Sequence, residues 1–194
     1  VITPTFNEAE NLPVLVERIH DALTGVPHEI VVADDNSPDG TWRIAEGLAG
    51  QDDSIIVLRR FHDHGLSAAV LDGMSVARAP YLAVIDADLQ HDASILPSML
   101  SCLRADDADV VVGSRESEDG GYGEWSIQRR FVSWVATAIA QLLLRVPTGD
   151  PMSGYFMLTR EAYEATATQI NPLGFKILLE FIGRNRDLRV EDLG

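Results

Sequence analysis

Two acidic side chains and one amide follow a mostly apolar segment of the chain at intervals of two residues. The segment runs from Tyr81 to Ile85, and Asp86, Asp88 and Gln90 come directly after it. Carboxylate and amide oxygens suit Mg²⁺ or Mn²⁺, which commonly binds one or two carboxylates together with substrate phosphates. While the chain stays extended, residues two apart point the same way. The spacing therefore predicts a metal site, although an acidic pair of this kind is also typical of a solvated turn.

A second pair of acids, Asp34 and Asp35, ends an earlier apolar segment. Open α/β sheets bind ligands outside the carboxyl ends of their strands, so both acidic clusters are expected to face one ligand. A nucleotide lying there needs an acceptor for its base, a partner for its ribose and a metal for its phosphates. We predict Asp35 for the base and Asp86 for the ribose. Asp88 and Gln90 are then the predicted metal ligands.

Basic side chains are the candidates for binding anionic groups. Arg115 closes another apolar segment, where a guanidinium would hold a diphosphate by paired hydrogen bonds. A surface ion pair with Glu116 or Glu118 explains Arg115 equally well. Arg129 and Arg130 begin a strongly apolar segment and would bind an anion at an edge that faces a membrane. Lys176 is the only lysine among 15 basic residues, which makes it a further candidate.

Apolar segments with the spacing of strands and of helices alternate along the first 115 residues. Strands are predicted at 2–3, 29–35, 54–60, 81–86 and 109–115, and helices at 12–23, 41–48, 65–77 and 94–103. Such alternation indicates a parallel sheet with helices on both faces. Further along, the sequence predicts a helix at 127–145, a strand within 150–158, a helix within 171–185 and a last strand at 188–193.

Composition and missing motifs limit the functional classes. With 194 residues, 46% of them hydrophobic, the chain can bury the core of one domain. The net charge of −15 argues against nucleic-acid binding and opposes adsorption of the whole surface to anionic lipid. Neither G-x-G-x-x-G after the first strand nor G-x-x-x-x-G-K-S/T occurs, which argues against a dinucleotide cofactor and a P-loop. The helix at 127–145 is expected in the core, with a membrane surface as the alternative.

Several short motifs resemble one family of enzymes. In chain order they are PTFNEAEN, DDNSPDGT, GLSAAVLDG, DADLQHD, GSR, QRR, DPMSGYF and NPLGFKILLE. Together they resemble the polyprenol (dolichol) phosphate mannosyltransferases of glycosyltransferase family 2. The resemblance extends across essentially the whole chain and implies a GT-A fold, with a mostly parallel sheet flanked by helices. The combination of DADLQHD and NPLGFK favours mannosyl transfer over the related glucosyl transfer to bactoprenol phosphate.

The resemblance also implies roles for individual residues of these motifs. The nucleobase pocket would be lined by Pro4, Phe6, Glu8 and Asp35, with Asp34 beside them. The ribose, the diphosphate and the metal would be held by Asp86, Ala87, Asp88 and Gln90. Of these, Asp88 and Gln90 would be direct metal ligands, and Asp86 would reach the metal through water. Phe6 stands where the family often has tyrosine, so base stacking is kept while a hydroxyl contact is lost.

The basic candidates receive matching roles. Arg115 would contact the donor, and Arg129 or Arg130 would bind the acceptor phosphate. Lys176 would reach the phosphate or sugar of the donor. Together with Asp88, these are the candidate catalytic residues.

The expected activity is inverting transfer of mannose from GDP-mannose to a polyprenyl (dolichyl) phosphate, with Mg²⁺ or Mn²⁺. We expect it at the cytoplasmic face of a membrane, with the protein either peripheral or anchored by a further C-terminal segment. We expect one GT-A domain over 1–194, with a nucleotide-binding half at 1–115, an acceptor-side half at 116–194 and truncation at both ends. UDP-glucose is the alternative donor. A nucleotidyltransferase is disfavoured, because the loop after the first strand is acidic and lacks glycine. A nucleotide-binding module without catalysis, recruiting a partner through 131–144, remains an alternative of another class.

Overall fold

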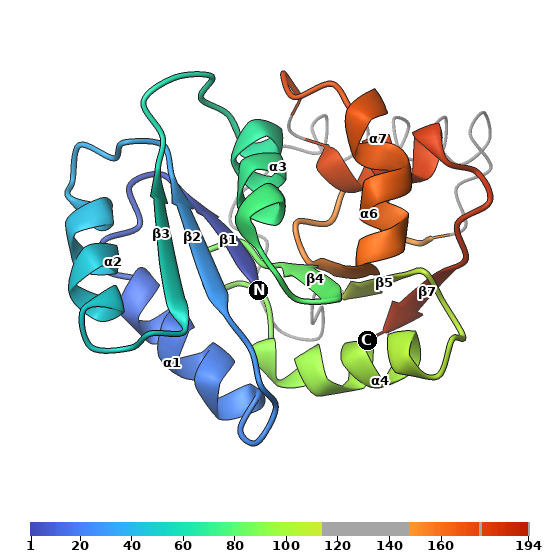
Figure 1. Ribbon diagram of the computed structural model, residues 1–194, viewed down its shortest axis with the longest axis horizontal. Coiled ribbons are helices and arrows are strands. Elements are labelled where there is room, and N and C mark those ends of the chain that lie inside the picture. Colours follow the sequence, from blue (N-terminus) through green and yellow to red (C-terminus); the bar gives the residue numbers. More distant parts are fainter. Residues whose placement is uncertain (114–147, 175, 194) are drawn as a thin grey trace, which may run out of the picture.

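One mixed sheet carries most of the predicted site. The computed structural model describes residues 1–113, 148–174 and 176–193, so Arg115, Arg129, Arg130 and the predicted helix at 127–145 lie outside the described residues. Within the described ranges, seven strands form the sheet in the order β3-β2-β1-β4-β6-β5-β7 (Figure 1). The strands are β1 Ile2–Thr5, β2 Ile30–Asp34, β3 Ile55–Arg59, β4 Tyr81–Val84, β5 Val110–Gly113, β6 Phe156–Thr159 and β7 Val190–Leu193.

The strands are mostly parallel, as the alternation of segments predicts. β1 pairs in parallel with β2 and β4, β2 pairs in parallel with β3, and β5 does so with β7. β6 differs because it lies antiparallel between β4 and β5. β1, β2 and β3 end in register, since Thr5 pairs with Asp34 and Asp34 with Arg59. The loops that follow these three strands therefore leave the sheet at the same end.

Helices cover both faces of this sheet (Figure 1). The face with α1, α2 and α4 lies opposite the face with α3, α6 and α7. The helices are α1 Leu12–Ala22, α2 Thr41–Ala49, α3 Leu66–Val76, α4 Leu96–Arg104, α6 Arg160–Thr166 and α7 Ile177–Arg184, with 3-10 turns at Ala93–Ile95 and Ala167–Gln169. None of the helices in the described ranges is long and apolar enough to cross a membrane.

The helices and strands predicted within the described residues are confirmed, with small shifts at their ends. The sequence did not predict α6, which is short and begins directly after β6. The hydroxyl group of Thr159 caps this helix by accepting a hydrogen bond from the backbone N–H of Ala162 at 3.1 Å. A threonine cap followed by an acid in the first turn, here Glu161, is the signal that could have identified the helix.

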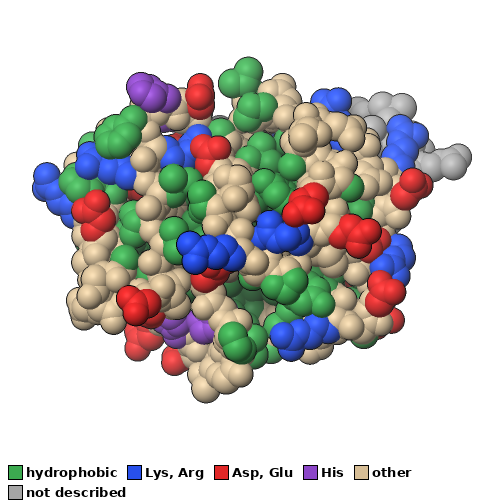
Figure 2. All heavy atoms as spheres, viewed as in Figure 1, with side chains coloured by type: hydrophobic (Ala, Val, Ile, Leu, Met, Phe, Trp, Pro, Cys, Tyr) green, Lys and Arg blue, Asp and Glu red, His purple; other side chains and the backbone are tan. Residues whose placement is uncertain are grey.

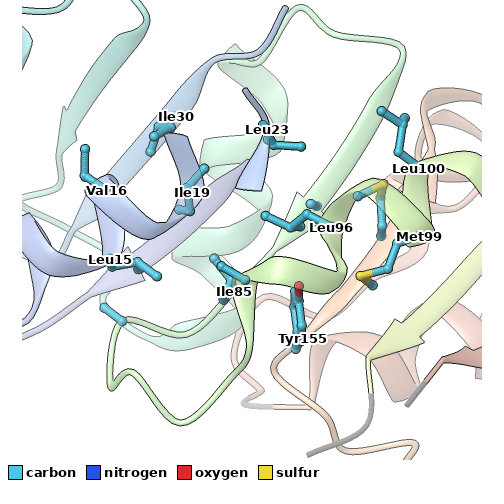
Figure 3. Packing of buried hydrophobic residues seen from close by; sticks show 14 of the residues in the cluster. Leu15, Val16, Ile19, Leu23, Ile30, Ile85, Leu96, Met99, Leu100 and Tyr155 are labelled. Atoms are coloured by element: carbon cyan, nitrogen blue, oxygen red, sulfur yellow. The ribbon is translucent and has the colours of Figure 1, made fainter. Parts of the chain in front are cut away.

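Core packing fixes the position of the acidic segment after β4. The buried face of α1 consists of Leu12, Leu15, Val16 and Ile19, which repeat at helical spacing. These residues share one apolar cluster with Leu96 of α4 and with Ile85 (Figure 3). Ile85 is fully buried and directly precedes Asp86. The acidic segment therefore starts from a residue that the core holds in place.

On the other face of the sheet, α3 lies directly against β1. A Cβ atom on Gly73 would be only 2.6 Å from Cγ2 of Ile2, so a glycine at this position permits the close approach. The first turn of α3, with Leu66 and Ala69, consequently lies near the carboxyl ends of the central strands.

Candidate active site

A cavity of about 270 Å³ opens where the loops after β1, β2 and β4 meet the start of α3. Residues on its wall are Pro4, Thr5, Phe6, Glu8, Asp35, Leu66, Ala69, Asp86, Ala87 and Asp88. The structure thus brings together seven residues that the sequence assigned to the site, namely Pro4, Phe6, Glu8, Asp35, Asp86, Ala87 and Asp88. Thr5, Leu66 and Ala69 were not assigned. Leu66 and Ala69 belong to the motif GLSAAVLDG, and their spacing of three on a helix could have identified them.

The loop that carries Phe6 and Glu8 is held by the segment after β2. Three successive backbone N–H groups donate to side chains there: Asn7 to Ser37 Oγ (3.0 Å), Glu8 to Thr41 Oγ1 (2.9 Å) and Ala9 to Asp39 Oδ2 (3.1 Å). Asp39 also accepts from the backbone N–H of Thr41 at 3.0 Å, at the start of α2. The segment SPDGT therefore begins a helix and also orients one wall of the cavity.

The two adjacent acids at the end of β2 have different surroundings. Asp34 is fully buried, and its carboxylate accepts hydrogen bonds from Thr5 Oγ1 at 3.0 Å and from the N–H and hydroxyl groups of Ser37 at 2.9 and 2.6 Å. It is not among the residues that line the cavity, whereas Asp35 is. Asp34 therefore joins β1 to the loop after β2, and Asp35 is the acid of the pair that faces the cavity.

The acidic segment after β4 is a turn rather than a continuation of the strand. β4 ends at Val84, a turn includes Ala87 and Asp88, and Leu89 has a φ angle of +62°. The premise that the chain stays extended here is therefore wrong, because the turn intervenes. Asp86 and Asp88 nevertheless both line the cavity.

A glycine from a distant segment leaves room for Asp86. Gly154 precedes β6 in the motif DPMSGYF, and a Cβ atom on it would overlap the carboxylate of Asp86. The side chain of Asp86 thus lies against the backbone just before β6, the strand that pairs with β4.

A buried histidine lies behind the same carboxylate. Nε2 of His91 is 3.8 Å from Oδ2 of Asp86, beyond hydrogen-bond distance, and its ring lies 5.2 Å from the ring of Tyr155. The hydroxyl group of Tyr155 donates to the carbonyl oxygen of Asp92 at 3.0 Å. Burial raises the pKa of the Tyr155 phenol well above its ordinary value, so this hydroxyl keeps its proton. These residues support the acidic segment from the core side.

Besides Asp34, two assigned residues within the described ranges do not reach the cavity wall. Gln90 is exposed, and its backbone N–H donates to Asp88 Oδ1 at 3.1 Å. Lys176 directly precedes α7, in a loop that packs on α3, where the Ser67 N–H donates to the carbonyl oxygen of Gly174 at 3.3 Å. The loop therefore lies beside the helix whose first turn lines the cavity, and both residues keep their assigned roles only as proposals.

The carboxylate side chains on the cavity wall suit one kind of metal ion. Asp86 and Asp88 supply two carboxylates, which suits Mg²⁺ or Mn²⁺ because these ions take further ligands from water and substrate phosphates. Among the described residues there is no group of three or more His, Cys, Asp or Glu side chains that could hold a metal by themselves. An all-protein site of the structural zinc type is therefore not formed by this part of the chain.

Sequence comparison relates the chain to known glycosyltransferases. The family model described as Glycosyl transferase family 2 matches residues 1–166. The chain is 37% identical to a dolichol-phosphate mannosyltransferase of Pyrococcus furiosus, covering 100% of this chain and 54% of the relative. It is 34% identical to the dolichol-phosphate mannosyltransferase of Saccharomyces cerevisiae, covering 98% of this chain and 73% of the relative. The chain thus spans about half the length of the Pyrococcus relative.

Solved structures show the same fold at low sequence identity. Staphylococcus aureus TarS (residues 1–349) superposes with a TM-score of 0.71 and 15% identity, over 99% of this chain and 56% of that chain. A second neighbour is glucosyl-3-phosphoglycerate synthase from Mycobacterium tuberculosis, crystallised with Mn²⁺, UDP and phosphoglyceric acid. It gives a TM-score of 0.72 and 19% identity, over 98% of this chain and 66% of that chain. The GT-A fold expected from the motifs is confirmed, and so is the resemblance to the dolichol-phosphate mannosyltransferases. The chain belongs to glycosyl transferase family 2.

Proposed function

We propose that this chain transfers mannose, with inversion, from GDP-mannose to a polyprenyl (dolichyl) phosphate. The observation that carries the proposal is the cavity wall, where residues from four separate motifs meet at the carboxyl ends of β1, β2 and β4. The relatives named dolichol-phosphate mannosyltransferase support this choice of reaction among those known for the family.

The donor would lie across the strand ends. Its base would stack on the exposed ring of Phe6, with Pro4, Glu8 and Asp35 around it. Asp86 would accept hydrogen bonds from the ribose hydroxyls. Asp88 with Gln90, and Asp86 through water, would hold Mg²⁺ or Mn²⁺, which when bound neutralises negative charge on the diphosphate. The presence of Mn²⁺ in the crystal structure of a neighbour in fold supports this choice of ion.

The reaction is a displacement at the anomeric carbon of mannose. An oxygen of the acceptor phosphate forms the new bond, the bond to the GDP oxygen breaks, and GDP leaves with that electron pair. A phosphate monoester has a second pKa of about 6, so the nucleophile is already anionic near neutral pH and needs no strong general base. Arg115 and Lys176 would stabilise charge on the leaving diphosphate, and Arg129 or Arg130 would bind the acceptor phosphate. A lipid acceptor also implies action at a membrane surface, which we place on the cytoplasmic face.

Calorimetric titration with GDP-mannose, UDP-glucose and GDP, first with Mn²⁺ and then with EDTA, tests the donor. We expect GDP-mannose to bind more tightly than UDP-glucose and to lose affinity in EDTA. A preference for UDP-glucose would instead indicate transfer of glucose to bactoprenol phosphate. If the protein as the cell makes it binds GDP-mannose but transfers no mannose to a polyprenyl phosphate, the non-catalytic binding module is the better description.

A further inference from the structure

A buried arginine, Arg60, lies directly behind Asp35 on the cavity wall. Arg60 follows β3, and its side chain is only 3% exposed. Its Nη1 group donates to Asp35 Oδ1, its Nε group donates to Asp72 Oδ2 at 2.8 Å, and its Nη2 group donates to the carbonyl oxygen of Asp63 at 2.6 Å. Every nitrogen of the guanidinium group therefore has an acceptor.

The same arrangement holds both oxygens of the Asp35 carboxylate. Oδ1 accepts from Arg60, and Oδ2 accepts from the backbone N–H of Gly65 at 2.7 Å. Gly65 has a φ angle of +140°, a conformation that residues with a side chain rarely adopt, and Asp63 in the same loop accepts from the guanidinium group. An ionised carboxylate offers about four acceptor positions on its two oxygens. Two donors from the protein leave acceptor positions for a ligand, and they fix the plane of the carboxylate.

Stability alone does not explain this pair well. Moving two charges out of water costs free energy, and buried ion pairs can often be replaced by apolar side chains without loss of stability. Here the pair is buried beside a cavity that Asp35 helps to line. The pair would be useful for ligand recognition, because Arg60 fixes Asp35 as a hydrogen-bond acceptor on the cavity wall.

We infer that Arg60 is a positioning residue that holds the Asp35 carboxylate as a fixed acceptor toward the nucleotide base, and so determines which base the cavity takes. This inference rests on the proposed function and adds the origin of base selectivity to it. Guanine presents an N–H and an amino group on its pairing edge, and both can donate to a fixed carboxylate. Adenine presents an acceptor nitrogen on that edge, which a carboxylate repels. Discrimination of this kind requires that the carboxylate cannot rotate away.

The test compares bases on otherwise identical ligands. GDP, ADP and inorganic pyrophosphate are titrated with Mn²⁺ into the wild-type protein, Arg60→Met and Arg60→Lys. We expect Arg60→Met to weaken GDP binding by about 10- to 100-fold, as for loss of a charge-assisted contact, while pyrophosphate binding changes less than about twofold. The GDP-to-ADP affinity ratio should therefore fall. In transfer assays the KM for GDP-mannose should rise, with kcat at saturating donor little changed.

Two further variants keep the test decisive. Arg60→Lys retains the charge but cannot supply the planar fork to three acceptors, so it should fold and still lose part of the GDP-to-ADP ratio. Asp72 is 56% exposed and contacts only the Nε side of the guanidinium group, so Asp72→Asn is the matched control and should keep the wild-type ratio. Circular dichroism melting establishes that each variant is folded.

The outcomes separate the inference from the proposed function. If folded Arg60→Met and Arg60→Lys keep the wild-type GDP-to-ADP ratio, Arg60 does not set base selectivity, while the mannosyltransferase proposal stands. If the wild-type protein binds ADP as tightly as GDP, the inference is overturned directly. If it binds no nucleoside diphosphate at all, both the inference and the proposed function fail.

Discussion

Asp88 is the residue whose removal should separate chemistry from folding. Its side chain is exposed and lines the cavity, so Asp88→Ala should change the free energy of unfolding by no more than about 0.5 kcal/mol. Because it is the proposed metal ligand, the same change should abolish Mn²⁺-dependent mannosyl transfer. A radiometric transfer assay across a Mn²⁺ titration measures this, together with a thermal melt.

Asp92 provides the control for Asp88 within the same loop. Its carboxylate caps a 3-10 turn by accepting from the N–H and hydroxyl groups of Ser94 at 2.8 and 2.7 Å. Asp92→Ala should cost about 1 kcal/mol of stability and leave transfer largely intact. Near-normal transfer by Asp88→Ala would remove the metal role assigned to it.

Gly154 should be intolerant of even one methyl group. The added Cβ atom in Gly154→Ala would occupy the space of the Asp86 carboxylate, and Asp86 would have to move away from its proposed position beside the ribose. We expect the affinity for GDP-mannose to fall by at least about tenfold, the equivalent of one lost contact of about 1.4 kcal/mol. Calorimetry measures the affinity. Gly47→Ala is the control, because no atom lies within 4 Å of the Cβ position there and the helix should gain up to about 1 kcal/mol.

At the scale of elements, an exposed arginine fastens the last strand. The backbone N–H and the guanidinium group of Arg189 donate to Asp109, with an Nη2–Oδ1 distance of 2.8 Å, immediately before β5 and β7 pair. The side-chain hydrogen bond from Arg189 holds the pKa of Asp109 below its ordinary value. Because the pKa is lower in the folded state than in the unfolded state, the stabilisation is present above the unfolded value of about 3.9 and is lost as the pH falls below it.

This contact predicts a pH-dependent effect of one substitution. Asp109→Asn should lower Tm at pH 7, and the difference from the wild-type protein should narrow as the pH falls below about 3.9, the unfolded value for aspartate, because the stabilisation by the ionised carboxylate is lost there. Thermal melts at a series of pH values measure the difference. Asp107→Asn, two residues away and exposed, should leave Tm nearly unchanged throughout. A difference that stays constant with pH would show that the ion pair does not contribute.

Helices and strands whose apolar residues follow a clear local pattern could be predicted from the sequence, but the order of the strands in the sheet could not. The apolar runs of β2 and β3 and the apolar face of α1 are local patterns, so the sequence shows them directly. The antiparallel position of β6 between β4 and β5 depends on pairing between distant segments, which no local pattern encodes.

The candidate site also has residues that the sequence could predict and residues that it could not. Motif positions identified most of the cavity wall, but Asp34 and Asp35 could not be distinguished, because their separation depends on Thr5 and Ser37. Arg60 was not found for a similar reason. Its partners lie on a different strand end and in the following loop and helix, and only the fold brings them together.

For the whole molecule, the proposed donor GDP-mannose and the metal ion should stabilise the folded state together. A ligand that binds only the folded state at 100 times its Kd adds about 2.7 kcal/mol to the free energy of unfolding. GDP-mannose with Mn²⁺ should therefore raise Tm clearly, and EDTA should remove most of that rise. UDP-glucose at the same concentration is the control and should raise Tm less. An equal rise with EDTA present would contradict a metal that bridges protein and donor.

The charge of the molecule is distributed rather than segregated on the face seen in Figure 2. Basic side chains lie among acidic ones there, although the formal net charge is −15. Such a surface does not attract anionic lipid or nucleic acid by itself. We propose Arg129 and Arg130, which lie outside the described residues, as a local feature that contacts a membrane.

The position of β6 has a consequence for how the chain is made. β4 ends at Val84, but one of its two neighbours in the sheet begins only at Phe156. A ribosome delivers β1 to β4 long before β6, so one side of β4 waits with unpaired backbone groups. Unpaired strand edges of this kind attract other chains, and distant pairings form slowly. We therefore expect nascent chains that stop before Phe156 to aggregate or to bind chaperones. Chains in which residues 156–159 have emerged should no longer do so.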